Sequence, residues 1–262
     1  MTERAALRHV WRLAVPAIGG LLDLVYPPRC LVCDRYDTPA LCETCYEAFT
    51  PLTEPTCPAC GRSVERREDG GLGHCHTCAE AGAAFGRWAF DTARTAAIYE
   101  GPMRHAIHRL KYDSCEALAE PLGAFLANRI AVDGLLAGTA LGQIDGIAAI
   151  PISAARERRR GFNQARLLAE PVAAILGVDL LDRAVIERIR RAAQVGLAPR
   201  ERRRNLTSAF SVAERQREAV EGRHLLLIDD VFTTGSSLHE CARALKAAGA
   251  ASVIGVTLAG GG

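Results

Sequence analysis

Two adjacent carboxylates and a run of hydroxyl side chains lie close together near the end of the chain. Asp229 and Asp230 follow the apolar run 225–228, and the hydroxyl-rich segment 233–237 comes shortly after them. Carboxylates accept hydrogen bonds from sugar hydroxyls, and a loop with one glycine can direct backbone N–H groups at a phosphate. A phosphate is also favoured at the N-terminus of a helix, which is predicted to follow. This spacing therefore indicates a site for a sugar phosphate.

The elements that must position these groups are a strand, a loop, a helix and a second strand. Residues 225–229, apolar up to Ile228, are typical of a buried parallel strand, 238–248 has helical spacing, and 252–258 is the next predicted strand. Open α/β sheets bind their ligands at the carboxyl ends of strands, where this order places the carboxylates. The alternative interpretation is an ordinary strand-to-helix turn with Ser236 or Ser237 as the N-cap.

The segment from Leu225 to Ser237 resembles the 5-phosphoribosyl-1-pyrophosphate (PRPP) loop of the type I phosphoribosyltransferases. In that family the acidic pair binds the 2- and 3-hydroxyls of the ribose, and the loop that follows binds the 5-phosphate. The resemblance implies catalytic roles for Asp229 and Asp230. The implied PRPP-binding residues are Asp229, Asp230, Val231, Phe232, Thr233, Thr234, Gly235, Ser236 and Ser237.

Eight of the ten cysteines form four C-x-x-C pairs, and two such pairs can bind one tetrahedral zinc ion. The pairs are Cys30 with Cys33, Cys42 with Cys45, Cys57 with Cys60, and Cys75 with Cys78. They predict two structural zinc ions. Pairing in sequence order is favoured, while an interleaved cross-brace stays open. A disulfide framework is the alternative, but nothing else in the sequence suggests secretion, and cytosolic thiols stay reduced.

Two groups of arginines accompany the predicted sheet. The first, Arg156 with 158–160, follows a strand predicted at 145–150, and the second lies in the segment 188–205. Arginine binds two phosphate oxygens at once, so both groups can offset the charge of a diphosphate. The second group is expected to form a mobile flap over the site. A solvated charged surface is the alternative for both.

Strands and helices alternate through the middle of the chain. Strands are predicted at 90–99 and 145–150, and helices at 101–111, 118–130 and 164–176. This alternation predicts an α/β fold with a parallel sheet.

The chain of 262 residues has room for one substantial domain and a smaller one. Residues 3–25 are predicted to form an amphipathic helix, because Pro16 and Asp23 interrupt an apolar stretch that is too short to span a bilayer. We therefore expect no integral membrane segment and a cytoplasmic protein.

The ordered motifs are together similar to the ComF (ComFC) family of competence-associated, phosphoribosyltransferase-like proteins. Besides the cysteine pairs and the loop 225–237, the matching residues are Tyr99-Glu100-Gly101, Leu110-Lys111-Tyr112, Pro151, Arg158 to Ala165, Gln194, Leu197, Arg202, Asn205 and Ala209-Phe210. The match extends from about Leu21 to Leu258.

This resemblance implies a type I phosphoribosyltransferase-like parallel sheet flanked by helices, with a small zinc-binding domain before it. The expected boundaries are 1–26 for the N-terminal helix, 27–85 for a double zinc ribbon and 88–262 for the phosphoribosyltransferase-like domain. Magnesium would accompany PRPP. The residues implied on the pyrophosphate side are Pro151, Ile152, Ser153, Arg158 and Arg160.

The implied activity is that of a glycosyltransferase, a phosphoribosyltransferase that displaces pyrophosphate at ribose C1. Its expected setting is nucleotide metabolism or natural competence, meaning the use of taken-up DNA. The alternative functions are a non-catalytic factor that handles single-stranded DNA and a scaffold for other competence proteins, each with the PRPP site as a sensor. In that setting, partner proteins would place the chain at the periphery of the inner membrane.

Overall fold

The computed structural model describes residues 27–53, 55–65, 71, 73–76, 78–80, 87–136, 143–187 and 210–261. The predicted helix at 3–25 and the arginine-rich segment 188–205 lie outside the described residues. No helix within the described ranges combines the length and the apolar character needed to cross a membrane.

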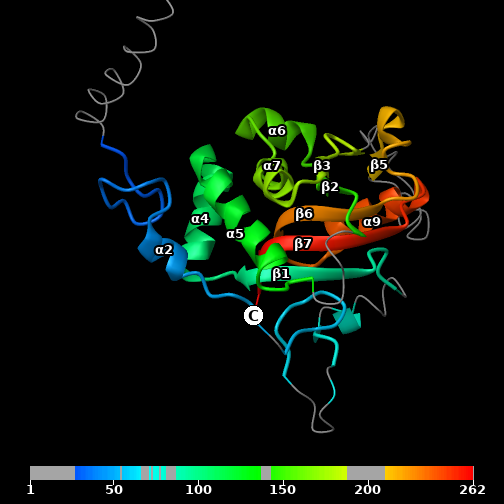
Figure 1. Cartoon of the computed structure of the whole chain (residues 1–262), viewed down its shortest axis with the longest axis horizontal. Helices are drawn as coiled ribbons and strands as arrows, with labels where there is room; N and C mark the ends of the chain where they lie inside the picture. The colour runs from blue at the N-terminus through cyan, green and yellow to red at the C-terminus, as the bar shows by residue number, and fades with distance from the viewer. Residues whose placement is uncertain are drawn as a thin grey trace, which may run out of the picture.

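Five parallel strands form the central sheet in the order β1-β7-β6-β2-β3 (Figure 1). Their bounds are Thr92–Ile98 for β1, Gly146–Ala149 for β2, Asp179–Leu180 for β3, His224–Phe232 for β6 and Ser252–Gly260 for β7. The central strand β6 is apolar and fully buried from Leu225 to Ile228, as a strand covered on both faces requires. The predicted parallel α/β sheet is therefore confirmed.

Helices cover both faces of this sheet (Figure 1). The helices of the described residues are α2 (Glu43–Glu47), α4 (Gly101–Tyr112), α5 (Ala119–Ala131), α6 (Ala154–Arg160), α7 (Gln164–Leu176) and α9 (Ser236–Ala247), with 3-10 turns at Glu116–Leu118 and Glu214–Gln216. An antiparallel pair, β4 (Val185–Glu187) with β5 (Phe210–Val212), contacts α9. The strands and helices predicted between residues 90 and 258 are present, with ends that shift by a few residues.

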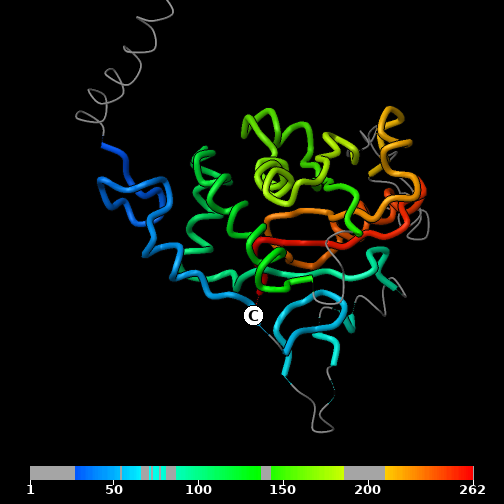
Figure 2. The backbone as a smooth tube through the Cα atoms, in the orientation of Figure 1, coloured from blue at the N-terminus to red at the C-terminus, as the bar shows by residue number. Residues whose placement is uncertain are grey.

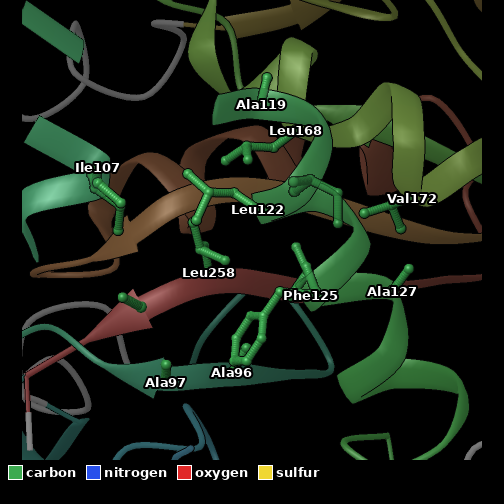
Figure 3. Packing of buried hydrophobic residues seen from close by; sticks show 14 of the residues in the cluster. Ala96, Ala97, Ile107, Ala119, Leu122, Phe125, Ala127, Leu168, Val172 and Leu258 are labelled. Atoms are coloured by element: carbon green, nitrogen blue, oxygen red, sulfur yellow. The ribbon is translucent and has the colours of Figure 1, made fainter. Parts of the chain in front are cut away.

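One face of the sheet packs against α4, α5 and α7. Figure 3 shows Leu122 and Phe125 of α5 between Leu168 of α7 on one side and Ala96 of β1 and Leu258 of β7 on the other. All five side chains are buried, so α5 fills the space between the sheet and α7.

The connections leave β2 and β6 in opposite directions, as the tube in Figure 2 shows. The chain from β2 passes through α6 and α7 to β3, whereas the chain from β6 passes through α9 to β7 on the other side. The strand order therefore reverses between β2 and β6, and ligands of open α/β sheets bind at such a point. Ile150, just after β2, donates its N–H to the carbonyl of Ile228 at 2.9 Å.

The cysteine-rich segment has two halves, one around Cys30 to Cys45 and the other around Cys57 to Cys78. The first half lies beside α4, and the second lies next to the edge strand β1 (Figure 1). Between the halves, Leu52 donates its N–H to Ala96 at 3.1 Å, and Ile98 donates to Thr50 at 2.9 Å. Arg129 of α5, which is buried, donates to the carbonyls of Leu52 and Ala96. The linker between the two halves, which contains Thr50 and Leu52, is thus hydrogen-bonded to β1 and α5.

Each half contributes cysteines to a different hydrophobic cluster. Cys30, Cys42 and Cys45 join the cluster on the α4, α5 and α7 face. Cys57, Cys60 and Cys78 join the cluster that contains the buried residues of α9. Both halves therefore share their cores with the α/β domain.

Candidate functional site

The acidic pair lies inside β6, close to its carboxyl end. The sequence predicts that the strand ends at Asp229, but β6 continues to Phe232 because pairing with β7 extends to Phe232 opposite Gly260. Asp230 is 4 % exposed, and the carboxylate of Asp229 accepts a hydrogen bond from the Asp230 N–H at 2.8 Å.

Lys111, near the C-terminus of α4, is the partner of this pair. Its Nζ lies 2.8 Å from Oδ1 of Asp230, and both side chains are largely buried. The second oxygen of Asp230, Oδ2, is buried and has no hydrogen-bond partner among the described residues. A buried carboxylate oxygen without a donor is costly, so Oδ2 is an acceptor available to a ligand hydroxyl.

The surroundings of Asp229 disfavour its ionised form. Burial, and next the charge of Asp230, raise the pKa of Asp229 to about 8, against the lowering effects of the Asp230 N–H and the Lys111 ammonium. Two carboxylates on successive residues of a partly desolvated strand end resist simultaneous ionisation. A ligand that donates hydrogen bonds to both carboxylates would relieve this repulsion.

The hydroxyl-rich segment forms the turn between β6 and α9. Gly235 has φ +76° and occupies the N-cap position of α9, so Ser236 and Ser237 begin the helix instead of capping it. Thr234 Oγ1 lies 3.0 Å from the hydroxyl of Ser236. The first amides of α9, which have no carbonyl partners within the helix, thus adjoin two hydroxyls, an arrangement that suits an anion.

The loop after β2 lies beside the acidic pair through the contact between Ile150 and Ile228. Ser153 caps α6 by accepting from the N–H of Arg156 at 3.4 Å. Pro151 and Ile152 line a cavity of ≈170 Å³ that extends toward β3. The loop after β2 is therefore fixed at the point where the strand order reverses. Pro151 and Ile152 line the adjacent cavity.

The first arginine group lies on α6, a helix that the apolar pattern did not indicate because none of its residues is buried. Arg158 is exposed. Arg160 donates to Gln164, and its guanidinium lies 5.5 Å from the ring centroid of Tyr112, which adjoins Lys111 on α4. Of the two candidate arginines, Arg160 is the one that contacts α4.

Two residues at this site were missing from the set of candidates in the sequence analysis. Lys111 is one of only two lysines in an arginine-rich chain, which is the signal that could have singled it out. Arg62, from the second half of the cysteine-rich segment, donates to the carbonyl of Thr233 at 3.4 Å. Its position two residues after a C-x-x-C pair is shared by Arg35, so position alone could not identify it.

The eight cysteines form two groups of four, and each group contains two C-x-x-C pairs that are consecutive in the sequence. The structure therefore has the sequential pairing and not the interleaved cross-brace. The groups are Cys30, Cys33, Cys42 and Cys45, and Cys57, Cys60, Cys75 and Cys78, with the sulfurs of each within 4.8 Å of one another. The sulfurs of Cys33 and Cys42 lie 3.7 Å apart in the first group, and those of Cys60 and Cys75 lie 3.5 Å apart in the second.

These separations fit zinc and do not fit disulfides. A tetrahedral zinc ion with Zn–S bonds of about 2.3 Å separates its sulfurs by about 3.8 Å, whereas bonded sulfurs lie about 2.05 Å apart. All ten cysteines are free thiols.

Gly235 offers a direct test of the loop geometry. A Cβ at this position would lie 2.8 Å from Phe232 Cζ and 3.1 Å from Trp88 Cη2, in a left-handed backbone conformation. We expect Gly235→Ala to lower the free energy of unfolding by more than the roughly 1–2 kcal/mol of left-handed strain and to abolish measurable binding of ribose 5-phosphate. Denaturant unfolding and calorimetry measure the two effects.

Gly222→Ala is the matched control, because Gly222 has φ +71° but no atom within 4 Å of its added Cβ. It should show the backbone strain alone and keep ribose 5-phosphate binding. Equal effects of the two substitutions on both measurements would contradict the crowding argument at Gly235.

The sheet order, the acidic pair and the glycine turn at the switch point define a phosphoribosyltransferase-like α/β domain, joined to a double zinc ribbon. Two family models match the chain accordingly: the double zinc ribbon domain over residues 21–81 and the phosphoribosyl transferase domain over residues 163–262.

Curated relatives match most of the chain. The DNA utilization protein YhgH of Salmonella typhi is 33% identical over 228 residues, which cover 82% of this chain and 94% of the relative. Competence protein F of Haemophilus influenzae is 29% identical, with 80% and 85% covered. The chain therefore belongs to the ComF family of competence-associated, phosphoribosyltransferase-like proteins.

Among solved structures, the glutamine PRPP amidotransferase from Bacillus subtilis in complex with ADP and GMP aligns with a TM-score of 0.38. It is 19% identical, and the alignment covers 55% of this chain and 26% of that chain.

Proposed function

We propose that the site at the carboxyl end of β6 binds PRPP together with magnesium. The observation that carries this proposal is the buried Oδ2 of Asp230, an acceptor that has no donor among the residues the structure describes and that lies beside a turn suited to a phosphate. A ribose 5-phosphate supplies both complements in one molecule, because its hydroxyls donate and its phosphate accepts. Asp229 and Asp230 would bind the ribose hydroxyls, and the segment 233–237 the 5-phosphate.

The charges around the pair suit the leaving group of a phosphoribosyl transfer. An acceptor forms a bond to ribose C1 while the bond from C1 to the pyrophosphate oxygen breaks. The electrons of the broken bond leave with pyrophosphate, and the proton that the acceptor loses passes to solvent. Magnesium would supply part of the charge that offsets this anion. Lys111 and Arg160, which approach from α4 and α6, are the proposed protein cations on that side, next to the loop 151–153.

For the cellular setting, we propose the use of DNA or its nucleotides. The relatives are named for DNA utilization and for competence. A site that handles an activated ribose phosphate fits the recovery of nucleotides from DNA that has been taken up. The acceptor of the ribosyl group would then be a nucleobase or water.

Asp230→Asn tests the site itself. The amide keeps the shape of the side chain but removes the charge and one acceptor oxygen. Hydrogen bonds to charged groups contribute about 1.5–3 kcal/mol, so we expect the affinity for magnesium-PRPP to fall by about one to two powers of ten. Isothermal titration calorimetry measures this affinity directly.

Asp179→Asn is the control, because this exposed aspartate lies at the amino end of the edge strand β3, whereas the site lies at the carboxyl end of the central strand β6. It should bind magnesium-PRPP like the parent protein. An unchanged affinity of Asp230→Asn for magnesium-PRPP would contradict the assignment of Asp230 to the PRPP site. Assays of pyrophosphate release and nucleotide formation with a panel of bases would then separate binding, hydrolysis and transfer.

A further inference from the structure

The two cysteine sites are built on the same backbone turn. Cys30 donates its N–H to the carbonyl of Arg35 at 2.9 Å, and Cys57 donates to the carbonyl of Arg62 at 2.7 Å. Each arginine stands two residues after the second cysteine of its pair. Arg35 and Arg62 therefore occupy equivalent positions in two equivalent turns.

The surroundings of the two turns differ because the second turn lies directly on β1. Ala93 of β1 donates its N–H to Ala59 at 2.8 Å. A Cβ at Gly61, which has φ +68°, would be only 2.8 Å from Cα of Arg94. The first turn has Asp34 at the corresponding position, with φ +58°. Glycine thus permits the second turn to approach the edge strand.

Docked in this way, Arg62 connects the second cysteine site to the glycine turn. Its Nη2 lies 3.5 Å from Sγ of Cys75, and its Nη1 donates to the carbonyl of Thr233 at 3.4 Å. The guanidinium carbon lies 5.2 Å from the ring centroid of Phe232. One planar group thus contacts a metal-ligand sulfur, an aromatic face and the first residue of the hydroxyl-rich segment.

Arg35 makes a different contact from the equivalent position. Its Nη1 donates to Oγ1 of Thr44, an exposed contact within the first half of the cysteine-rich segment. The connection to the glycine turn is therefore a property of Arg62 and of its docking on β1.

We propose that Arg62 is a positioning residue that makes the second cysteine site part of the support of the phosphate-binding turn. A thiolate attracts the guanidinium, whose fork then holds the carbonyl of Thr233. Because a trans peptide is planar, the N–H of Thr234 must point away from that carbonyl. Fixing the carbonyl on the Arg62 side thus directs one amide of the turn to the opposite side, ready for an anion. The inference rests on the proposed role of 233–237 in binding the 5-phosphate.

Arg62→Met, with Arg35→Met as the matched control, tests this coupling in the full-length zinc-loaded protein. The first readout is hydrogen exchange of the amides of 233–237 without ligand, and the second is calorimetric binding of ribose 5-phosphate. In Arg62→Met we expect exchange about tenfold faster and binding about tenfold weaker, as for the loss of one charge-assisted hydrogen bond. Arg35→Met should change neither readout, and metal analysis should find two zinc ions in both.

Arg62→Lys covers the case in which the methionine variant loses its metal. Lysine keeps the charge and the stem but has no fork to reach Cys75 and Thr233 together, so it should also speed exchange. Exchange equal to that of the parent protein in both Arg62 variants would overturn the coupling. A parent protein that does not bind ribose 5-phosphate would refute the proposed function, while the exchange comparison would still decide the role of Arg62.

Discussion

Removal of metal from the two four-cysteine sites is expected to unfold residues 27–80 and to lower the melting temperature of the whole chain. Structural zinc contributes about 10–16 kcal/mol to the folding of small zinc modules, whereas an entire domain is stable by about 5–15 kcal/mol. The described part of the cysteine-rich segment has no separate core that could replace this contribution of the metal, because its buried cysteines pack into the two clusters of the α/β domain. Loss of metal therefore exposes both faces of the sheet near β1.

Metal analysis and thermal unfolding, with and without a strong chelator, check this result, and the parent protein should contain two zinc ions. Cys42→Ser and Cys57→Ser each remove one buried ligand from a different group and should each lower the zinc content to about one ion. Cys115→Ser is the control, because this partly buried cysteine lies outside both groups. A chelated, metal-free protein with the parent melting temperature would contradict the argument.

The features that sequence predicts well here are those encoded over short spans. The apolar run of β6, the acidic pair and the C-x-x-C pairs each occupy neighbouring positions, so their local pattern already specifies a strand, a turn and a metal site. The same holds for α7, where Asn163 caps the first turn and Gly177 takes the left-handed conformation at the end.

The contacts that complete the site are long-range, and no local pattern contains them. Arg62 reaches Thr233 across 171 positions of the chain. Lys111 belongs to a helix whose apolar pattern predicts its buried face but not what its polar residues meet. α6 escaped prediction for a related reason: a helix without buried residues has no apolar periodicity.

The packing of the cysteine-rich segment against the rest of the chain was also beyond the local signals. Cysteine spacing predicts a small metal-binding unit at 27–85, but spacing does not show which surfaces that unit shares. In the structure, Leu52 of the linker accepts from the buried Arg129 and donates to Ala96 of β1. Deletion of residues 1–85 would therefore expose part of the core, and point variants such as Arg62→Met are the sharper tests of what the zinc ribbon does.

Lys111→Met is expected to be the most damaging single substitution near the acidic pair. Breaking a buried ion pair by removing one partner costs about 3–5 kcal/mol, because the other charge stays buried without compensation. Lys246→Met is the matched control: Lys246 makes an ion pair with Asp91 at the same 2.8 Å, but both groups are more exposed. Exposed pairs contribute about 0–1 kcal/mol, so this control should be nearly neutral in denaturant unfolding.

The pH dependence identifies the cause of the loss. A carboxyl group whose pKa is raised on folding binds more protons in the folded state than in the unfolded state, so stability falls as pH rises between the two values. For Asp229 this window extends from an ordinary pKa of about 3.9 to about 8. Without Lys111 the fall should become steeper, so that Lys111→Met is nearly as stable as the parent at pH 4 and much less stable at pH 8.

The double variant Lys111→Met with Asp230→Asn completes the argument, since it removes both charges of the pair. It should recover most of the stability lost in Lys111→Met at pH 8, and the double-mutant cycle should give a coupling energy of about 0.5–3 kcal/mol. A loss in Lys111→Met that is equal at pH 4 and pH 8 and persists in the double variant would show that the lysine acts through the packing of its stem. Recovery at pH 8 would instead show that Lys111 stabilises the ligand-free site by compensating the buried negative charge of Asp230, a charge that the hydroxyl donors of a ligand would also stabilise.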